Sequence, residues 1–400
     1  MGNFFLPIVF ENIFPPLSMM TFYLLAWISS LLVFYPKIFI SKSLAYIYVF
    51  AILYFSLFYS GIFDVDLSWI RRELQSLFFA IIILQYFLHS RDFKGLKIIL
   101  IISFVFIITT IITTLIGLQE FPDASRGLAG GLAAREEYEL IDFYRSIGIA
   151  GYDFFYGLAF AIPVLVAYFK MNTLNVLNKY FFAILISLSI YGILRAQFTT
   201  AFIFALIGII LAFWTKEKVK PAVLRLILFL LLIMIIPEEL IADGILSLSK
   251  VIEEGTLQNR LVDLSISVRE GIGEQGTHID RRYDRIPVLL DNFLSSPIIG
   301  GGESLGHNWW FDRLSMFGLI GIIPWILIIW KQIDFNLKIL KEDSAIYYLI
   351  TMFLFIGMGF IKNMGQTRVM IFMFFIIPSL LIIKDHMKHI SFKHSFKYAK

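Results

Sequence analysis

The sequence predicts an all-α polytopic membrane protein that forms a single transmembrane domain over residues 1–400. Hydrophobic residues make up 58% of the chain and charged residues only 16%, whereas soluble domains average about 45–50% apolar and about 25% charged. Many apolar runs are also long enough to cross roughly 30 Å of hydrocarbon as helices. These runs exceed the roughly 10-residue strands of membrane barrels, so we expect helices that pair their backbone groups internally.

About eleven to twelve transmembrane helices fit the apolar runs. A short apolar segment at 4–14 is expected to form either a half-helix or an interfacial piece, and it decides between the two counts. In chain order, the predicted spans are 18–34, 44–60, 74–89, 95–117, 147–169, 179–195, 198–214, 221–236, 309–330, 344–361 and 368–383.

The lysines indicate which loops face the cytoplasm. Loops that stay in the cytoplasm carry an excess of basic residues, and here lysine shows this excess in every second loop. We therefore place these loops and the C-terminus inside. The lysine-bearing segments are 35–43, 90–97, 170–179, 215–220, 331–343 and 384–400.

Most arginines fall on the opposite, predicted outward side. Topology does not explain this split, because lysine and arginine serve it equally. A guanidinium group binds phosphate through a rigid two-donor fork and tolerates desolvation better than an ammonium group. One interpretation is an outward anionic ligand such as a phosphate or diphosphate, and the other is ion pairing with outward acids. The arginines are Arg71, Arg72, Arg126, Arg135, Arg145, Arg195, Arg260, Arg269, Arg281, Arg282, Arg285 and Arg368.

Two predicted outward loops are long, at 118–146 and 237–308. Most connections in compact folds are far shorter, and long ones are usually functional or disordered. We expect the second loop to contain two or three short helices, one over 241–255 and another over 281–296. The apolar side of the latter fits either the membrane surface or the helix bundle.

One segment of the sequence carries a candidate chemical motif. It reads RRYDRIPVLLDNFLSSPIIGGGESLGHNWWFDRLSMFGLIG over residues 281–321 and resembles the O-antigen polymerase and ligase superfamily of bacterial surface-polysaccharide enzymes. That family's pattern is an arginine, an apolar helix with an aromatic residue, Pro-x-x-Gly-x-Gly, then His-Asn, and Gly-x-x-Gly within the next span. The matching residues are Arg282, Phe293, Pro297, Gly300, Gly302, His307, Asn308, Gly318 and Gly321. Segments that begin at Arg145 and Arg195 are weaker matches to other parts of the family pattern.

The resemblance implies a role for several side chains. His307 is the expected general base, since histidine titrates near neutral pH, and Asn308 would orient either this base or the acceptor. The glycines would let the backbone turn tightly and approach a ligand. The predicted diphosphate-binding residues are Arg195, Arg282, Arg145 and Arg285, and the predicted glycan-binding residues are Tyr283, Trp309 and Trp310.

Structural roles remain the alternatives for these residues. His307 also fits an interfacial histidine, and the tryptophans fit an aromatic belt at the membrane surface. We expect Arg313 to pair with Asp312. A polar hairpin tip forms either a plain turn or the wall of a site, and it contains Asn363, Gln366 and Arg368.

The resemblance implies a repeat-unit polymerase of the bacterial inner membrane, and we expect its active site and both long loops to lie in the periplasm. It would transfer the growing glycan from undecaprenyl diphosphate to the terminal sugar of a lipid-linked repeat unit. Cysteine is absent, and no phosphate loop, HExxH or GxGxxG motif is present, so we expect a metal-independent glycosyltransferase without a cofactor. Expected partners are the lipid-linked oligosaccharide, the bilayer and a chain-length regulator protein, but no nucleic acid. Two alternatives stay open: the ligase that transfers glycan to lipid A-core, and a flippase for lipid-linked units.

Overall fold

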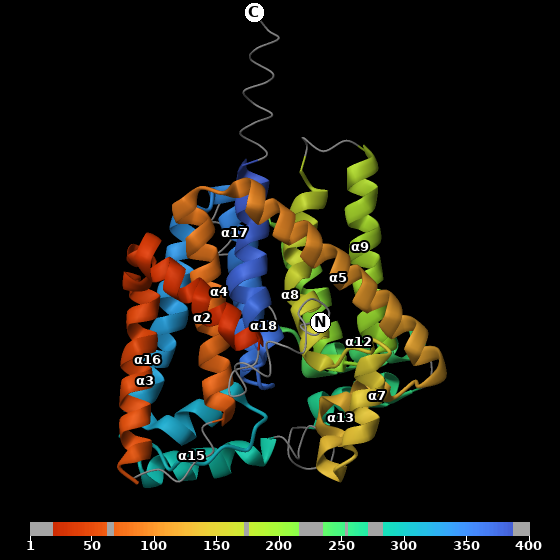
Figure 1. Ribbon diagram of the computed structural model, residues 1–400. Coiled ribbons are helices and arrows are strands. Elements are labelled where there is room, and N and C mark those ends of the chain that lie inside the picture. The colour runs from red at the N-terminus through yellow and green to blue at the C-terminus, as the bar shows by residue number, and fades with distance from the viewer. Residues whose placement is uncertain are drawn as a thin grey trace, which may run out of the picture.

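The computed structural model describes residues 19–61, 68–171, 176–215, 235–252, 255–270 and 283–386. Over these residues every regular element is a helix, which confirms the predicted fold class (Figure 1). Seven described helices are long and apolar enough to cross a membrane. They are α3 (Lys42–Tyr59), α4 (Ser68–Ser90), α5 (Phe93–Glu120), α8 (Tyr152–Phe169), α9 (Val176–Arg195), α16 (Trp309–Ile339) and a run that joins α18 (Thr367–Ile371) and η5 (Phe372–Ile376) and ends at His386.

Three further helices occupy predicted spans: α2 (Met19–Phe34), α10 (Thr199–Trp214) and α17 (Glu342–Gly359). The predicted segment 4–14, and all but the end of 221–236, lie outside the described residues. One predicted boundary was wrong, because α16 continues through the expected loop at 331–343 as far as Ile339. An exposed Lys338–Asp334 ion pair one turn apart, 2.7 Å between Nζ and Oδ2, accompanies this extension.

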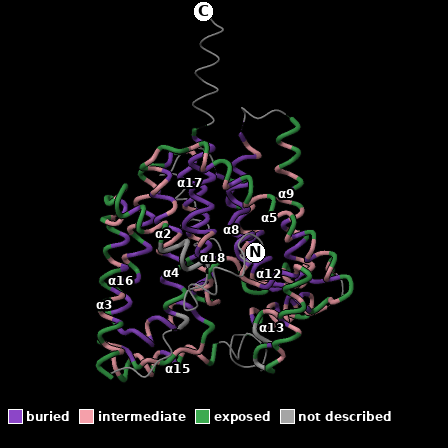
Figure 2. Tube along the Cα trace, viewed as in Figure 1, coloured by how far each residue is buried: buried purple, intermediate pink, exposed green. Residues whose placement is uncertain are grey.

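The helix α8 forms the centre of the bundle. Its sequence is apolar on all sides, as expected of a helix that is buried all round, and α9, α10 and α17 pack against it. Figure 2 shows buried residues concentrated along α8, α17 and α18. Two bonds to backbone carbonyls link these helices, from Thr351 Oγ1 to Phe160 O (3.2 Å) and from Tyr168 Oη to Leu380 O (2.6 Å).

A second packing unit pairs α16 with α3, and Phe50 packs edge-to-face against Phe317 and Trp325 at their contact. In contrast, α5 crosses the outside of the bundle obliquely (Figure 1) and leaves apolar side chains such as Ile101 and Val105 exposed. An apolar helix with exposed apolar side chains is suited to contact with lipid.

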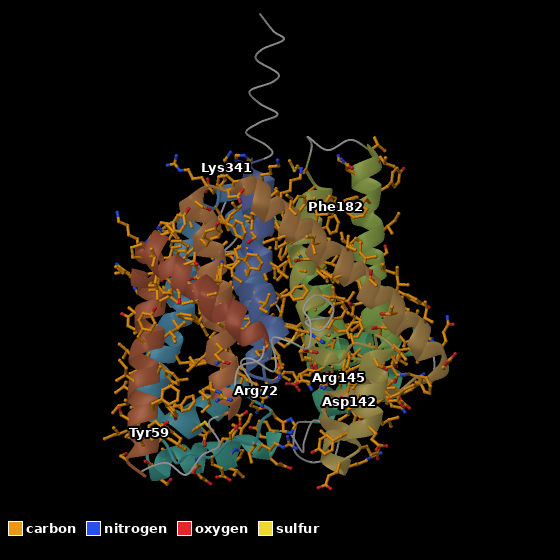
Figure 3. All side chains as sticks on the ribbon, in the orientation of Figure 1. Tyr59, Arg72, Asp142, Arg145, Phe182 and Lys341 are labelled. Carbon is orange, nitrogen blue, oxygen red and sulfur yellow. The ribbon has the colours of Figure 1, made fainter. Side chains whose placement is uncertain are left out.

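The two ends of the bundle differ in their basic residues. Lys341 lies at one end, and Arg72 and Arg145 lie together at the other (Figure 3). We call these the lysine end and the arginine end. At the lysine end the carboxylate of Asp385 accepts hydrogen bonds from Ser344 Oγ (2.5 Å) and from the Lys341 N–H (2.9 Å), which joins α17 to the end of the last span.

Short helices from both long loops cover the arginine end (Figure 1). The larger loop contributes α12 (Glu238–Val251), α13 (Thr256–Glu270) and α15 (Arg285–Ser295), while the smaller contributes α6 (Ala124–Arg126), η3 (Gly127–Gly131), η4 (Ala133–Arg135) and α7 (Tyr138–Ser146). The predicted helices over 241–255 and 281–296 therefore correspond to α12 and α15. Gln197, between α9 and α10, forms a hydrogen bond with each loop. Its backbone carbonyl accepts one from Arg126 Nη1 of the smaller loop (3.1 Å), and its side-chain oxygen accepts one from the Thr256 N–H of the larger loop (3.1 Å).

Candidate functional site

The glycine-rich segment before α16 docks on a break in that helix. Gly318 interrupts α16 with φ 53° and ψ −162°, a conformation that is close to glycine-only. A Cβ atom at Gly300 would lie 2.6 Å from the Gly318 nitrogen, so neither position leaves room for a side chain. Three backbone hydrogen bonds join the segments: Gly301 N to Ser315 O (2.9 Å), Leu319 N to Pro297 O (2.9 Å) and Ile320 N to Ile298 O (3.0 Å).

The backbone of Gly300 lies against α16 itself. At this glycine the close approach, which we expected to be toward a ligand, is made by a neighbouring helix. The side-chain nitrogen of Asn292 in α15 also donates to Ser315 Oγ (2.6 Å). As a result, α15, the glycine segment and the start of α16 form one connected unit at the arginine end.

A single carboxylate, that of Asp312, holds the loop that contains His307. Its Oδ1 accepts the N–H groups of Leu305 (2.8 Å) and Gly306 (3.1 Å), and its Oδ2 accepts the N–H of Asn308 (3.0 Å). Because three backbone donors converge on one fixed acceptor group, the loop around His307 has a defined path. Within this loop His307 is exposed and Asn308 is buried.

Behind the loop lies a buried ion pair that the sequence did not predict. Arg313 pairs with Glu73 of α4, and both partners are 1% exposed. Trp309 Nε1 donates to the other oxygen of Glu73 (2.8 Å), and the Arg313 guanidinium lies 5.4 Å from the Trp325 ring centroid. Aromatic rings and a tryptophan donor surround a pair that would otherwise be costly in a span.

A cavity of about 650 Å³ opens at the arginine end beside this pair. Its wall combines the start of α4, the end of α7, the start of α8 and the turn before α18. Arg72, Arg145 and Arg368 all line it, and Figure 3 shows Arg72 and Arg145 across from each other on their separate helices. The acidic residues of the wall are Glu73, which pairs with Arg313, and Asp153, whose Oδ1 lies 3.4 Å from Arg368 Nη1. We call this the arginine cavity.

Polar groups fix the remaining wall. Gln366 donates from Nε2 to the hydroxyl of Tyr152, and Thr367 Oγ1 accepts from Ser76 Oγ (2.9 Å). Asn363, Gln366 and Arg368 thus line the cavity, so the hairpin tip forms the wall of a site as well as a turn. Among the described lining residues, three guanidinium groups against two carboxylates give a formal excess of one positive charge, which suits an anion.

The arginine cavity brings together only part of the predicted site. Arg145 lines it, whereas Arg195, Arg285 and His307 do not. Arg282 lies outside the described residues. His307 is connected to the cavity only indirectly. Trp309, the first residue of the helix that follows it, donates a hydrogen bond to Glu73, which lines the cavity.

The predicted aromatic residues have different environments. Tyr283 is 51% exposed and accessible to a ligand. Trp309 is 0% exposed, so in this conformation its ring is closed to a glycan and serves packing. Trp310 is partly buried, and its Nε1 donates to Ile356 O (2.9 Å).

Sequence analysis did not single out Arg72, Tyr152 or Asp153 as site residues. Their positions give one signal, since Arg72 begins a span on the arginine-rich side and Tyr152-Asp153 opens the central span. In the part of the chain that the structure describes, no group of three His, Asp or Glu side chains converges as a metal site requires.

Comparison with known proteins gives no further guide. No family model matches the chain, and no curated protein or solved structure matches it.

Proposed function

We propose that the protein is a surface-polysaccharide repeat-unit polymerase. It transfers the growing glycan from undecaprenyl diphosphate to the terminal sugar of a lipid-linked repeat unit. The observation that carries the proposal is the arginine cavity, in which Arg72, Arg145 and Arg368 converge from three separate segments at one end of a membrane bundle. The resemblance of residues 282–321 to the O-antigen superfamily supplies the reaction class.

The arginine cavity suits the leaving group of this reaction. When the acceptor hydroxyl attacks the anomeric carbon, the diphosphate departs and gains negative charge. Forked guanidinium donors aimed at such a group stabilise the charge as it develops. The volume of about 650 Å³ falls within the roughly 300–1,000 Å³ typical of small-molecule sites.

A base must take the proton of the attacking hydroxyl, and His307 is our candidate. It is exposed on a loop that Asp312 holds in place, and histidine is the residue type that most often acts as a general base near neutral pH. The neighbouring Asn308 is buried, where it can hold the loop backbone in register with α16. In this assignment Tyr283 remains an exposed candidate for glycan contact.

We place the arginine end in the periplasm of a bacterial inner membrane. Lysine-rich loops mark the cytoplasmic side of membrane proteins, and Lys341 and Lys384 lie at the opposite end from the arginine cavity. Lipid-linked repeat units would then enter from the outer leaflet. A chain-length regulator protein is the proposed partner at this face.

Deletion of the gene in its source bacterium tests the proposal. We expect surface glycan with single repeat units in place of long chains. Loss of all glycan on lipid A-core would identify a ligase, and accumulation of lipid-linked units at the cytoplasmic leaflet would identify a flippase. Unchanged chain length would refute all three assignments.

Complementation with variants links the phenotype to the cavity. Arg145→Ala should fail to restore long chains, because it removes one of the cavity's cations. Arg269→Ala is the matched control, since Arg269 lies on α13 and pairs with Asp243 away from the cavity. Restoration by both variants alike would remove the cavity from the mechanism. Restoration by His307→Ala would remove the base assignment.

A further inference from the structure

A second cavity lies next to the arginine cavity and has a different chemistry. It measures about 580 Å³ and is bounded by the end of α5 and by α6, η3, η4 and α7. One wall of chain separates the two spaces. Tyr144 lines the second cavity, whereas the next residue, Arg145, lines the arginine cavity. Likewise, Gly127 lines the second cavity and its neighbour Leu128 lines the arginine cavity.

Among the lining residues that the structure describes, the charges of the second cavity cancel. Two carboxylates, of Glu120 and Asp123, face it together with two guanidinium groups, of Arg126 and Arg135. Arg126 is also held by its hydrogen bond to the carbonyl of Gln197. A wall with balanced charge has no net attraction for a diphosphate, so this space suits an uncharged ligand that both donates and accepts hydrogen bonds.

Aromatic rings supply the apolar part of the same wall. Phe121 and Tyr144 both line the cavity, with ring centroids 5.4 Å apart and planes inclined at 51°. Phe143 packs edge-on against Phe121 at 5.6 Å and holds its ring in position. Phe121 and Tyr144 are each only partly buried, so ring surface remains available in the cavity.

An uncharged sugar matches all of these features. Its hydroxyl groups donate to carboxylates and accept from guanidinium groups, while its C–H surfaces pack on aromatic rings. We propose that the second cavity, lined by Phe121, Asp123 and Tyr144, binds an uncharged sugar residue of the acceptor glycan. This inference rests on the proposed function for the identity of the glycan.

The shared wall explains why two sites would be adjacent. The acceptor sugar in the second cavity and the donor diphosphate in the arginine cavity would be held on the two sides of α7. Their separation is then fixed by one short helix, whose end is secured where Thr113 Oγ1 donates to Gly148 O (2.9 Å).

Binding measurements on the full chain in lipid nanodiscs test the inference. The first probe is the source bacterium's repeat-unit oligosaccharide, released from its lipid so that it carries no phosphate, and the second is inorganic pyrophosphate. Tyr144→Ala should weaken oligosaccharide binding by roughly tenfold and change pyrophosphate binding by less than about twofold. Arg145→Ala, one residue along, should show the opposite pattern.

Two further variants make the result specific. Asp123→Asn keeps the shape of the side chain and should also weaken oligosaccharide binding. Tyr138→Ala, an exposed tyrosine of the same helix that does not line the cavity, should bind both probes like the unmodified chain. Thermal unfolding of each variant establishes that it is folded.

Absence of oligosaccharide binding by the folded unmodified chain would overturn the inference. So would oligosaccharide binding that is insensitive to both Tyr144→Ala and Asp123→Asn. Either result leaves the proposed function standing if the deletion strain still loses long chains. Failure of the proposed function appears instead as normal chain length in that strain.

Discussion

Replacing Gly318 with alanine tests how the glycine segment is joined to α16. The added Cβ would lie 2.6 Å from the Ile298 oxygen and closer still to the Gly300 nitrogen. The backbone at φ 53° and ψ −162° would cost a residue other than glycine about 1–3 kcal/mol. Separation of the segments would also break the hydrogen bonds of Leu319 and Ile320 to the loop, each worth about 0.5–1.5 kcal/mol.

Together these effects predict a loss of about 2–6 kcal/mol in the free energy of unfolding. The assay is denaturant-induced unfolding of the chain in mixed micelles, followed by tryptophan fluorescence. Gly244→Ala is the matched control, because Gly244 lies within α12 and a Cβ there meets nothing within 4 Å. That variant should gain up to about 1 kcal/mol from helix propensity. Equal stability of the two variants would refute the docking of the loop on the break in α16.

Three further predictions concern buried polar groups. Glu73→Leu should destabilise the chain by about 3–5 kcal/mol because it leaves the buried Arg313 charge without its carboxylate. Adding Arg313→Met to this variant should recover most of the lost free energy of unfolding in the same assay. Asp385→Ala should cost about 1–3 kcal/mol by leaving buried donors unsatisfied; unchanged unfolding would show that this link between helices contributes nothing. Asp312→Ala should speed hydrogen exchange of the 305–308 backbone, and unchanged exchange would contradict its role in holding the loop.

The sequence predicted the helices because span length is a local property. Runs of apolar residues give the position of α3, α5, α9 and α10 to within a few residues. The end of α16 was missed because Lys331, Asp334 and Lys338 look like a loop by hydropathy. They remain helical, since charged residues can continue a helix beyond the hydrocarbon with a salt bridge one turn apart.

The candidate site was harder to predict because its contacts are non-local. Arg313 pairs with Glu73, which lies in a helix far away in the sequence, and no local pattern predicts that contact. The arginines of the cavity were all predicted to share one side of the membrane, but no local pattern distinguishes Arg72 and Arg368, which line the arginine cavity, from Arg195 and Arg285, which do not. That distinction depends on which helix ends meet.

The contacts of the glycines were also beyond prediction from the sequence. The glycines over 300–306 were expected to allow a close approach, and Gly300 makes one against Gly318 of α16. The sequence could not indicate what approaches, because a ligand and a neighbouring helix impose the same demand for a missing side chain.

The most direct test of the account is glycan elongation by the purified chain in nanodiscs, supplied only with undecaprenyl diphosphate-linked repeat units. We predict a ladder of products that grows by one repeat unit at a time, disappears with Arg145→Ala and persists with Arg269→Ala. Units that stay single with the folded, unmodified chain, or a ladder that Arg145→Ala leaves unchanged, would contradict the claim that the arginine cavity holds the diphosphate of a glycosyl donor.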